Sequence, residues 1–333
     1  MNTKLKAFLQ YAVMLLLTGG LLWLSLRSLN VGDENKADFI WSAWQKSDKT
    51  YLITMAGIII LSHLLRAIRW QLLLIPTNNF ITLKNSFLSV MVGYLINLVI
   101  PRGGEVSRCY NLYKLENTPV ETSFGTVVVE RIIDVLCLLI IIVTSFVLEW
   151  SKLEIFIATL DFSGSQWLLS PWVIGAAFIL VVAFSLAAFF FIRRNEKLKK
   201  LFDGFKEGLF AVFKLEKKAL FIFYSLSIWI LYFLMSYCAI MAFEQTRPLG
   251  FSAVMTLFAI GAIAMAAPLP GGAGSYHTLV PLGLVMLYHL PKADAIAFVF
   301  IFHAWQTLIV IAIGLLSLLA SYAIIRWKKQ PIK

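Results

Sequence analysis

Side chains suited to binding a phosphate group are concentrated in the stretch 101–108, which reads Pro-Arg-Gly-Gly-Glu-Val-Ser-Arg. Its glycines, Gly103 and Gly104, permit a tight turn and close approach of the backbone. A helix beginning after Gly104 would present unpaired N–H groups and the positive end of its dipole. The planar guanidinium groups of Arg102 and Arg108 suit phosphate. The stretch therefore predicts a site that contacts an anionic headgroup or substrate.

A plainer interpretation of the same stretch is a capped helix start without a ligand. Glu105 would lie in the first helical turn, where a carboxylate complements the dipole. It could also pair with Arg108, because residues three apart on a helix are neighbours. The sequence alone leaves both interpretations open.

A second group of charges lies between Thr126 and Leu148, in an apolar segment. Glu130, Arg131 and Asp134 fall within five positions, and Arg131 and Asp134 have the spacing of an ion pair. Ionisable groups in a membrane segment should avoid lipid and face the interior, where they mark functional sites. Alternatively, they anchor the helix at the interface, with Arg131 extending toward water.

A second proline-glycine break contains Pro270, Gly271 and Gly272, and we include these residues in the predicted binding site. His277 and His303 lie in apolar surroundings near it and are also site candidates. Each histidine is either a satisfied polar group or part of a proton relay. The sequence has no metal-binding spacing, so we expect neither a metal nor a cofactor.

The elements that must position these residues cross a membrane. Apolar residues make up 60% of the 333 residues and charged residues only 14%, whereas soluble domains carry roughly 25% charged residues. The net charge of +11 then indicates positive-inside loops and contact with anionic lipids rather than nucleic acid. Runs long enough to span the bilayer are Phe8–Leu26, Tyr51–Leu74, Thr126–Leu148, Trp172–Ile192, Ala219–Phe243 and Ala295–Ile325.

The distribution of Lys and Arg predicts the topology. Both termini and the loop Arg193–Lys218 are rich in these residues and should be cytoplasmic. Counting the spans from these cytoplasmic segments predicts that Leu83–Leu115 enters the membrane from the cytoplasm and that Phe251–Leu290 enters it from outside. We expect broken or re-entrant hairpins in an inverted-topology repeat, 51–148 and 219–325. The alternative is that each hairpin consists of two ordinary full-length helices.

Two smaller features complete the expected organisation within a single membrane domain, 1–333. The segment 196–214 has one apolar face and many lysines, which predicts an amphipathic helix on the cytoplasmic lipid surface. A linker helix packed on another loop is the alternative. Arg66 and Arg69 share one face of the second helix, and we interpret them as anchors at its cytoplasmic end.

The ordered motifs resemble those of the lysylphosphatidylglycerol synthetase membrane-region family, also called the flippase-like domain. The family pattern of proline, glycine-glutamate and arginine is matched at 101–108. Its valine-x-glutamate-arginine-x-x-aspartate pattern is matched at 128–134, and its proline-x-proline-glycine-glycine-x-glycine pattern at 268–274. Each motif alone is weak, but their order along nearly the whole chain is specific. Two family features, a glutamate after the last motif and a tyrosine-arginine pair, are replaced around His277 and by Phe302-His303.

The resemblance implies an all-α integral membrane protein that translocates or binds lipids in a bacterial or archaeal cytoplasmic (inner) membrane. Membrane lipids, anionic or linked to polyprenyl phosphate, are the expected partners, and the expected function is that of a flippase-type transporter for a lipid or lipid-linked sugar. Composite family members add a soluble aminoacyltransferase domain, which this sequence lacks, so we do not expect lipid aminoacylation. The alternatives are a membrane-embedded enzyme acting on a lipid phosphate and a lipid-binding accessory protein without transport activity.

Overall fold

The computed structural model describes residues 16, 18–29, 31–32, 34–150, 154, 195–267 and 269–328. This part of the chain is helical and contains no strand, which confirms the all-α class. The expected span Trp172–Ile192 and half of Phe8–Leu26 lie outside the described residues. The longer helices are α2 (Lys36–Lys46), α3 (Lys49–Leu74), α4 (Leu83–Asn97), α5 (Gly103–Glu116), α6 (Val120–Leu148), α9 (Glu196–Phe210), α10 (Lys218–Ala242), α11 (Gly250–Ala266), α12 (Ser275–Tyr288) and α13 (Lys292–Lys328).

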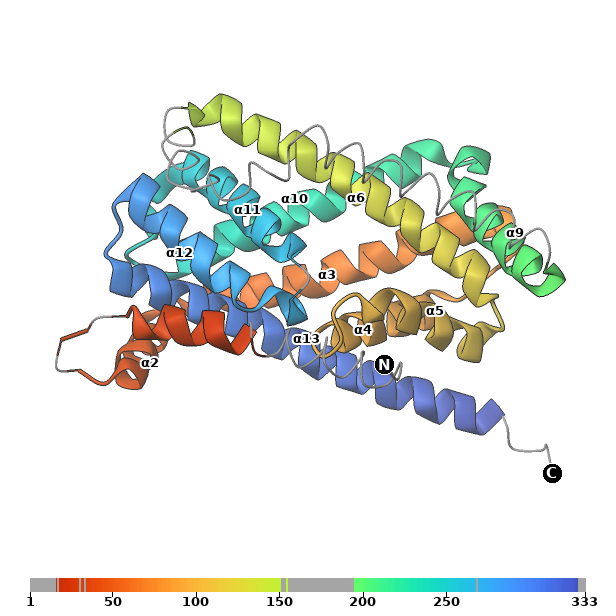
Figure 1. Cartoon of the computed structure of the whole chain (residues 1–333), viewed down its shortest axis with the longest axis horizontal. Helices are drawn as coiled ribbons and strands as arrows, with labels where there is room; N and C mark the ends of the chain where they lie inside the picture. Colours follow the sequence, from red (N-terminus) through yellow and green to blue (C-terminus); the bar gives the residue numbers. More distant parts are fainter. Residues whose placement is uncertain are drawn as a thin grey trace.

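The chain is a multi-pass membrane protein, because several of its helices are long and apolar enough to cross a bilayer. The predicted spans within α3, α6, α10 and α13 are all helical, and these helices run along the long axis of the molecule (Figure 1). Among the described residues, four stretches meet the length and hydropathy expected of a span: Lys49–Thr77, Lys218–Ala242, Arg247–Met265 and Lys292–Lys328.

Two helical hairpins lie between the long helices, at opposite ends of the bundle (Figure 1). One is formed by α4 and α5, and the other by α11 and α12. Helices α4, α5 and α12 have 14 to 15 residues and extend only about 21–23 Å, less than the ~30 Å of a hydrocarbon core. Helix α11 is longer and belongs to the span-length stretch Arg247–Met265. The tips of the hairpins meet, since a Cβ on Gly271 would lie 2.9 Å from Leu98 Cδ2.

The pair Gly103–Gly104 is not the non-helical part of the first break, contrary to the expectation that the helix begins after it. Helix α5 begins at Gly103, and the preceding Arg102 makes the turn with φ 62°. A Cβ on Gly93 would lie 2.8 Å from the Gly104 carbonyl oxygen, and one on Gly104 would lie 2.6 Å from the side chain of Asn97. The glycines therefore allow the backbones of α4 and α5 to touch.

The second break differs from the first because its glycines do leave the helical conformation. Gly271 and Gly272 have φ 57° and 70°, within a short 3₁₀ turn, η5 (Pro270–Gly272), that separates α11 from α12. Residues that carry a Cβ rarely adopt this left-handed backbone conformation, so glycine fits it best.

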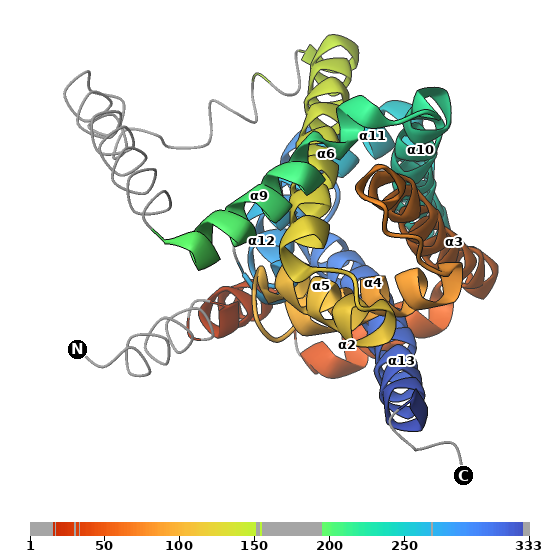
Figure 2. The same ribbon diagram turned by 90° about the vertical axis from the view of Figure 1, so that its right-hand side faces the viewer.

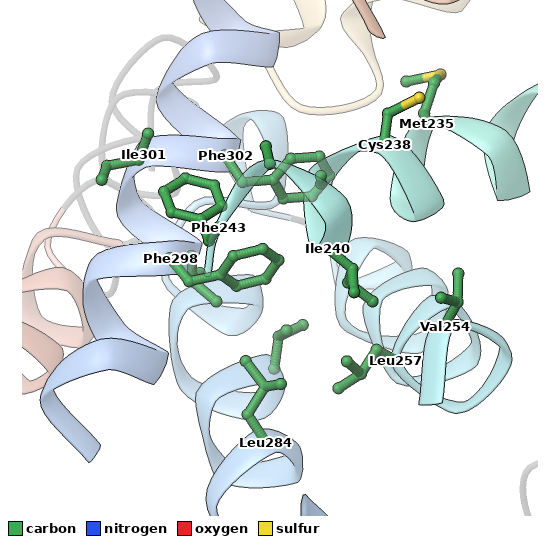
Figure 3. Packing of buried hydrophobic residues seen from close by; sticks show 14 of the residues in the cluster. Met235, Cys238, Ile240, Phe243, Val254, Leu257, Leu284, Phe298, Ile301 and Phe302 are labelled. Carbon is green, nitrogen blue, oxygen red and sulfur yellow. The ribbon is translucent and has the colours of Figure 1, made fainter. Parts of the chain in front are cut away.

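The largest apolar core lies between α3, α10, α11, α12 and α13. Figure 3 shows Phe243 and Phe298 packed together, with their ring centroids 5.2 Å apart, beside Leu257 and Leu284. A second, smaller core around Trp70 joins α3, α4, α5 and α6. The two cores fix each hairpin against the long helices.

Candidate functional site

The candidate site is built on a buried ion-pair network between α3 and α6. Arg66 and Arg69 lie one turn apart on α3, and Glu130 and Asp134 lie one turn apart on α6. Arg66 Nη1 is 2.9 Å from Asp134 Oδ2, Arg69 Nη2 is 3.0 Å from Asp134 Oδ1, and Arg69 Nε is 3.4 Å from Glu130 Oε1. The four residues thus form a chain of alternating charges inside the bundle.

The interpretation of Arg66 and Arg69 as cytoplasmic-end anchors is wrong. Their relative accessibilities are 2% and 0%, and neither reaches an aqueous surface. Arg66 Nη2 also donates to the Tyr232 hydroxyl at 2.8 Å, and Arg69 Nη1 donates to Ser225 Oγ at 3.2 Å. Both partners lie on α10, so the arginines hold three helices together.

Arg108 extends the network to α5 and therefore to the first hairpin. Its Nη2 lies 2.5 Å from Glu130 Oε2, and its guanidinium group lies 4.0 Å from the centre of the Trp70 ring. The Trp70 indole in turn donates to Thr126 Oγ1 at 2.9 Å. Because Arg108 pairs with Glu130, the local Glu105–Arg108 ion pair considered from the sequence does not form.

Glu105 instead pairs across the helices with Arg131, at the accessible edge of the network. Arg131 Nη2 is 2.9 Å from Glu105 Oε1, and Arg131 Nη1 is 3.6 Å from Asp134 Oδ2. The Arg131 side chain is 37% exposed. Glu105 Oε2 and Arg131 Nε are buried and have no hydrogen-bond partner among the described residues. Because Arg131 is the most exposed of the four arginines in the network, this pair is the part that a ligand can approach.

An open cavity of about 500 Å³ lies against this pair, between α5 and α6. Three charged residues, Arg102, Glu105 and Arg131, lie along it, but they contribute almost no polar surface to its wall. The rest of the lining is apolar: Val106, Phe124, Val127, Val128, Ile132, Val135 and Leu136. A hydrocarbon chain matches this wall, and the charged group of an amphiphile would have to lie beside the three charged residues.

Cations outnumber carboxylates in the network. Four guanidinium groups face three carboxylates, namely Arg66, Arg69, Arg108 and Arg131 against Glu105, Glu130 and Asp134. An uncompensated charge in a low-dielectric interior is unfavourable. An anionic ligand beside Arg131 would therefore restore the balance. In the described part of the chain, no three His, Cys, Asp or Glu residues lie close enough to hold a metal ion.

The second break forms a cluster of its own and does not line the cavity. His303 Nε2 lies 3.1 Å from the Gly271 carbonyl oxygen, and the His277 and His303 rings are 4.8 Å apart between centroids. The Tyr276 ring stacks on His303 at 5.4 Å. The candidate residues from the two breaks thus fall into two groups, which meet only where the hairpin tips touch.

Six residues in or bonded to the network were not among the site candidates from the sequence: Arg66, Arg69, Trp70, Thr126, Ser225 and Tyr232. The sequence did contain one indication that the two arginines are not anchors. An anchor is normally followed by a polar loop, whereas Arg69 is followed by the apolar run Leu72–Leu74 before α3 ends. Nothing in the spacing of Trp70 or Tyr232 distinguishes them from the other aromatic residues of apolar helices.

The comparisons with known proteins agree with this architecture. The sequence model described as "Lysylphosphatidylglycerol synthase TM region" matches residues 11–314. A UPF0104 membrane protein of Methanocaldococcus jannaschii is 31% identical over 140 residues, covering 41% of this chain and 39% of that protein. One of Methanothermobacter thermautotrophicus is 28% identical over 159 residues, covering 47% and 44%. The matches thus span under half the length of these relatives. No solved structure matches the chain.

Proposed function

Because the chain belongs to the lysylphosphatidylglycerol synthase TM-region family, we propose that it is a flippase-type transporter of a lipid or lipid-linked sugar. The observation that carries this proposal is the cavity between α5 and α6. It combines two arginines with an apolar wall, and a membrane lipid combines a phosphate with hydrocarbon chains. The anionic headgroup would bind beside Arg102 and Arg131, at mid-membrane.

The energetic problem that such a site addresses is the cost of moving a charged headgroup through hydrocarbon. Arg131 offers a planar fork that can donate two parallel hydrogen bonds to phosphate oxygens. The hydrocarbon chains stay against apolar side chains such as Val128 and Ile132. As the headgroup leaves water, it would then be surrounded by guanidinium groups rather than by lipid tails.

Binding at Arg131 would also change the contact between the two helices. A phosphate would compete with Glu105 for the same guanidinium group. Of the ion pairs between α5 and α6 described above, the Glu105–Arg131 pair is the accessible one. The other pair, Arg108–Glu130, is buried. Headgroup binding would loosen the rim of the cavity while the buried pair still holds the helices together.

The arrangement of the hairpins supports an inverted repeat, 51–148 and 219–325, with alternating access. Each hairpin lies between two long helices, and the two hairpins approach from opposite ends of the bundle (Figure 1). Alternate opening at the two ends would expose the headgroup to one face and then the other. The end that carries α9 would face the cytoplasm of a bacterial or archaeal cell, with both termini on that side.

Arg131→Ala tests the proposal in vesicles that contain the purified protein and a fluorescent phosphatidylglycerol. Removing a hydrogen-bonded charge should weaken headgroup binding by about 1.5–3 kcal/mol, roughly ten- to hundredfold in affinity, and slow lipid movement accordingly. The affinity of Arg131→Lys should lie between those of the unaltered protein and Arg131→Ala, because lysine keeps the charge but lacks the planar guanidinium group. The matched control is Arg247→Ala, which removes an exposed guanidinium paired with Asp48, outside the cavity.

Misfolding could imitate this result, since Arg131→Ala leaves Glu105 without its cationic partner. The double variant with Glu105→Gln removes that stranded charge, and thermal unfolding is measured beside transport. Normal lipid movement in a stable Arg131→Ala protein would contradict the proposal. Chemical change of the lipid, followed in parallel by mass spectrometry, would favour the enzyme alternative. Lipid binding without movement would favour an accessory protein.

A further inference from the structure

Helix α9 is attached to α6 through glycines that bring the two backbones into contact. A Cβ on Gly208 would lie 3.0 Å from the Thr126 nitrogen, and one on Gly125 would lie 2.8 Å from the Leu209 nitrogen. A Cβ on Gly204 would meet the Glu121 side chain at 2.6 Å. Larger residues would not fit this contact, so the glycine edge of α9 is already occupied.

Several large apolar side chains of α9 remain exposed although the helix packs on α6. Its aromatic side chains are exposed: Phe202 and Phe210 are each 45% accessible, and Phe213, just beyond the helix end, is 72% accessible. Leu201 is 49% accessible on the same element. The predicted amphipathic helix therefore keeps exposed apolar side chains even though one edge packs on α6.

Exposed lysines outnumber the exposed acidic residues in this segment. The lysines are Lys197, Lys199, Lys200, Lys206 and Lys214, and the acidic residues are Glu196, Asp203 and Glu207. Aromatic and aliphatic side chains bordered by lysines are typical of helices that lie in the headgroup region of anionic membranes. A protein partner would instead have to combine an apolar groove with an acidic rim.

The orientation of α9 fits a membrane surface. Figure 2 shows α9 along its length, whereas α3 and α10 are seen more nearly end-on. If α3 and α10 cross the bilayer, α9 lies in the membrane plane. It is also at the same end of the molecule as the last turn of α13 (Figure 1), which carries Arg326 and Lys328.

We infer that α9 is an interfacial anchor that seats its exposed phenylalanines in an anionic lipid surface and thereby positions one wall of the α5–α6 cavity. Phe205 of α9 packs on Phe124 of α6 with ring centroids 6.2 Å apart, and Phe124 lines the cavity. The inner face of α9 thus touches the candidate site, while its outer face contacts lipid. The anchor itself does not depend on transport by the cavity.

A fluorescent probe on a single introduced cysteine tests, in the full-length protein, whether the exposed side chains of α9 lie in the lipid surface. The probe, an environment-sensitive dye, is placed at Phe213→Cys or, as a matched control on the lysine side, at Lys200→Cys. The three native cysteines are buried and serve as the unlabelled background. The protein is reconstituted in phosphatidylcholine vesicles with and without phosphatidylglycerol, and quenching by spin-labelled lipids is recorded.

We expect the dye at position 213 to shift to the blue and to be quenched severalfold more than at position 200, with a further increase in phosphatidylglycerol. Replacing Lys199 and Lys206 by Gln should reduce that increase, since each lysine near an anionic surface changes affinity about fivefold. Equal quenching at both positions would overturn the anchor. Protection of position 213 that varies with protein concentration would also overturn it, in favour of a second protein copy.

Discussion

At the scale of single residues, Arg102 combines charge with an unfavourable backbone. It stands in the left-handed region at φ 62°, directly before α5, and its side chain lines the cavity. Non-glycine residues in this region cost roughly 1–2 kcal/mol. Glycine would suit the turn better, so the presence of arginine points to a role for its side chain.

Arg102→Gly and Arg102→Ala separate the backbone from the charge. Both variants remove the guanidinium group, and both should weaken the binding of anionic lipid to a similar extent. Only glycine relieves the strain of the left-handed backbone. The free energy of unfolding of Arg102→Gly should therefore exceed that of Arg102→Ala by about 1 kcal/mol. Thermal unfolding in detergent and a lipid-binding titration measure the two effects. A glycine variant less stable than the alanine variant would show that the turn is not strained.

The pairing of the buried charges illustrates what a single sequence cannot reveal. Spacing alone correctly placed Arg131 and Asp134 on one face of α6, and these residues do pair. It also suggested a pair between Glu105 and Arg108, but both residues bind partners on α6 instead. Local spacing reports which residues share a helix face. The partner across the bundle depends on packing, which the sequence pattern does not contain.

At the scale of elements, Glu116 ties together the open ends of the first hairpin. It terminates α5, and its Oε1 accepts hydrogen bonds from the Thr82 backbone, the Thr82 hydroxyl and the Asn85 side chain, at 3.1, 2.9 and 2.7 Å. Burial alone would raise the pKa of Glu116. These hydrogen bonds and the nearby Lys328 outweigh burial and hold its pKa below the usual range.

The lowered pKa predicts a pH dependence of stability. A carboxylate with a depressed folded-state pKa stabilises the protein above the ordinary value of about 4.3, and this contribution is lost as the pH falls through the folded-state pKa. Glu116→Gln should therefore lower the unfolding temperature at neutral pH but much less in acid. Glu216→Gln, at an exposed position before α10, is the control. If Glu116→Gln lowered the unfolding temperature equally at both pH values, the lowered pKa of Glu116 would be contradicted.

Most element boundaries followed from hydropathy and glycine or proline signals. Helix α2 was not predicted, and at the first break the glycine pair was expected to interrupt the helix but lies inside α5. Gly103 and Gly104 resemble a turn signal in the sequence because glycine serves both turns and close helix packing. Deciding between the two uses requires knowing that Gly93 of α4 lies opposite, and that is tertiary information.

At the scale of the whole molecule, the distribution of lysines and arginines still predicts which end faces the cytoplasm. Cysteines introduced at the exposed positions Gln45 and Lys200 lie at opposite ends of the bundle. A membrane-impermeant maleimide should label Gln45→Cys in intact cells and Lys200→Cys only after lysis. The reverse pattern would invert the orientation of the proposed transport path. Labelling of both positions after lysis is the control for accessibility.

Where the hairpins meet, the side chain of Leu98 lies against the backbone of Gly271. Polar groups approach this contact from both ends, including Asn97 on one side and His303 on the other. Between these polar groups, the contact of Leu98 with Gly271 is apolar. On the proposed path, a contact of this kind that stays closed while a lipid changes leaflets would keep water and ions from following the headgroup.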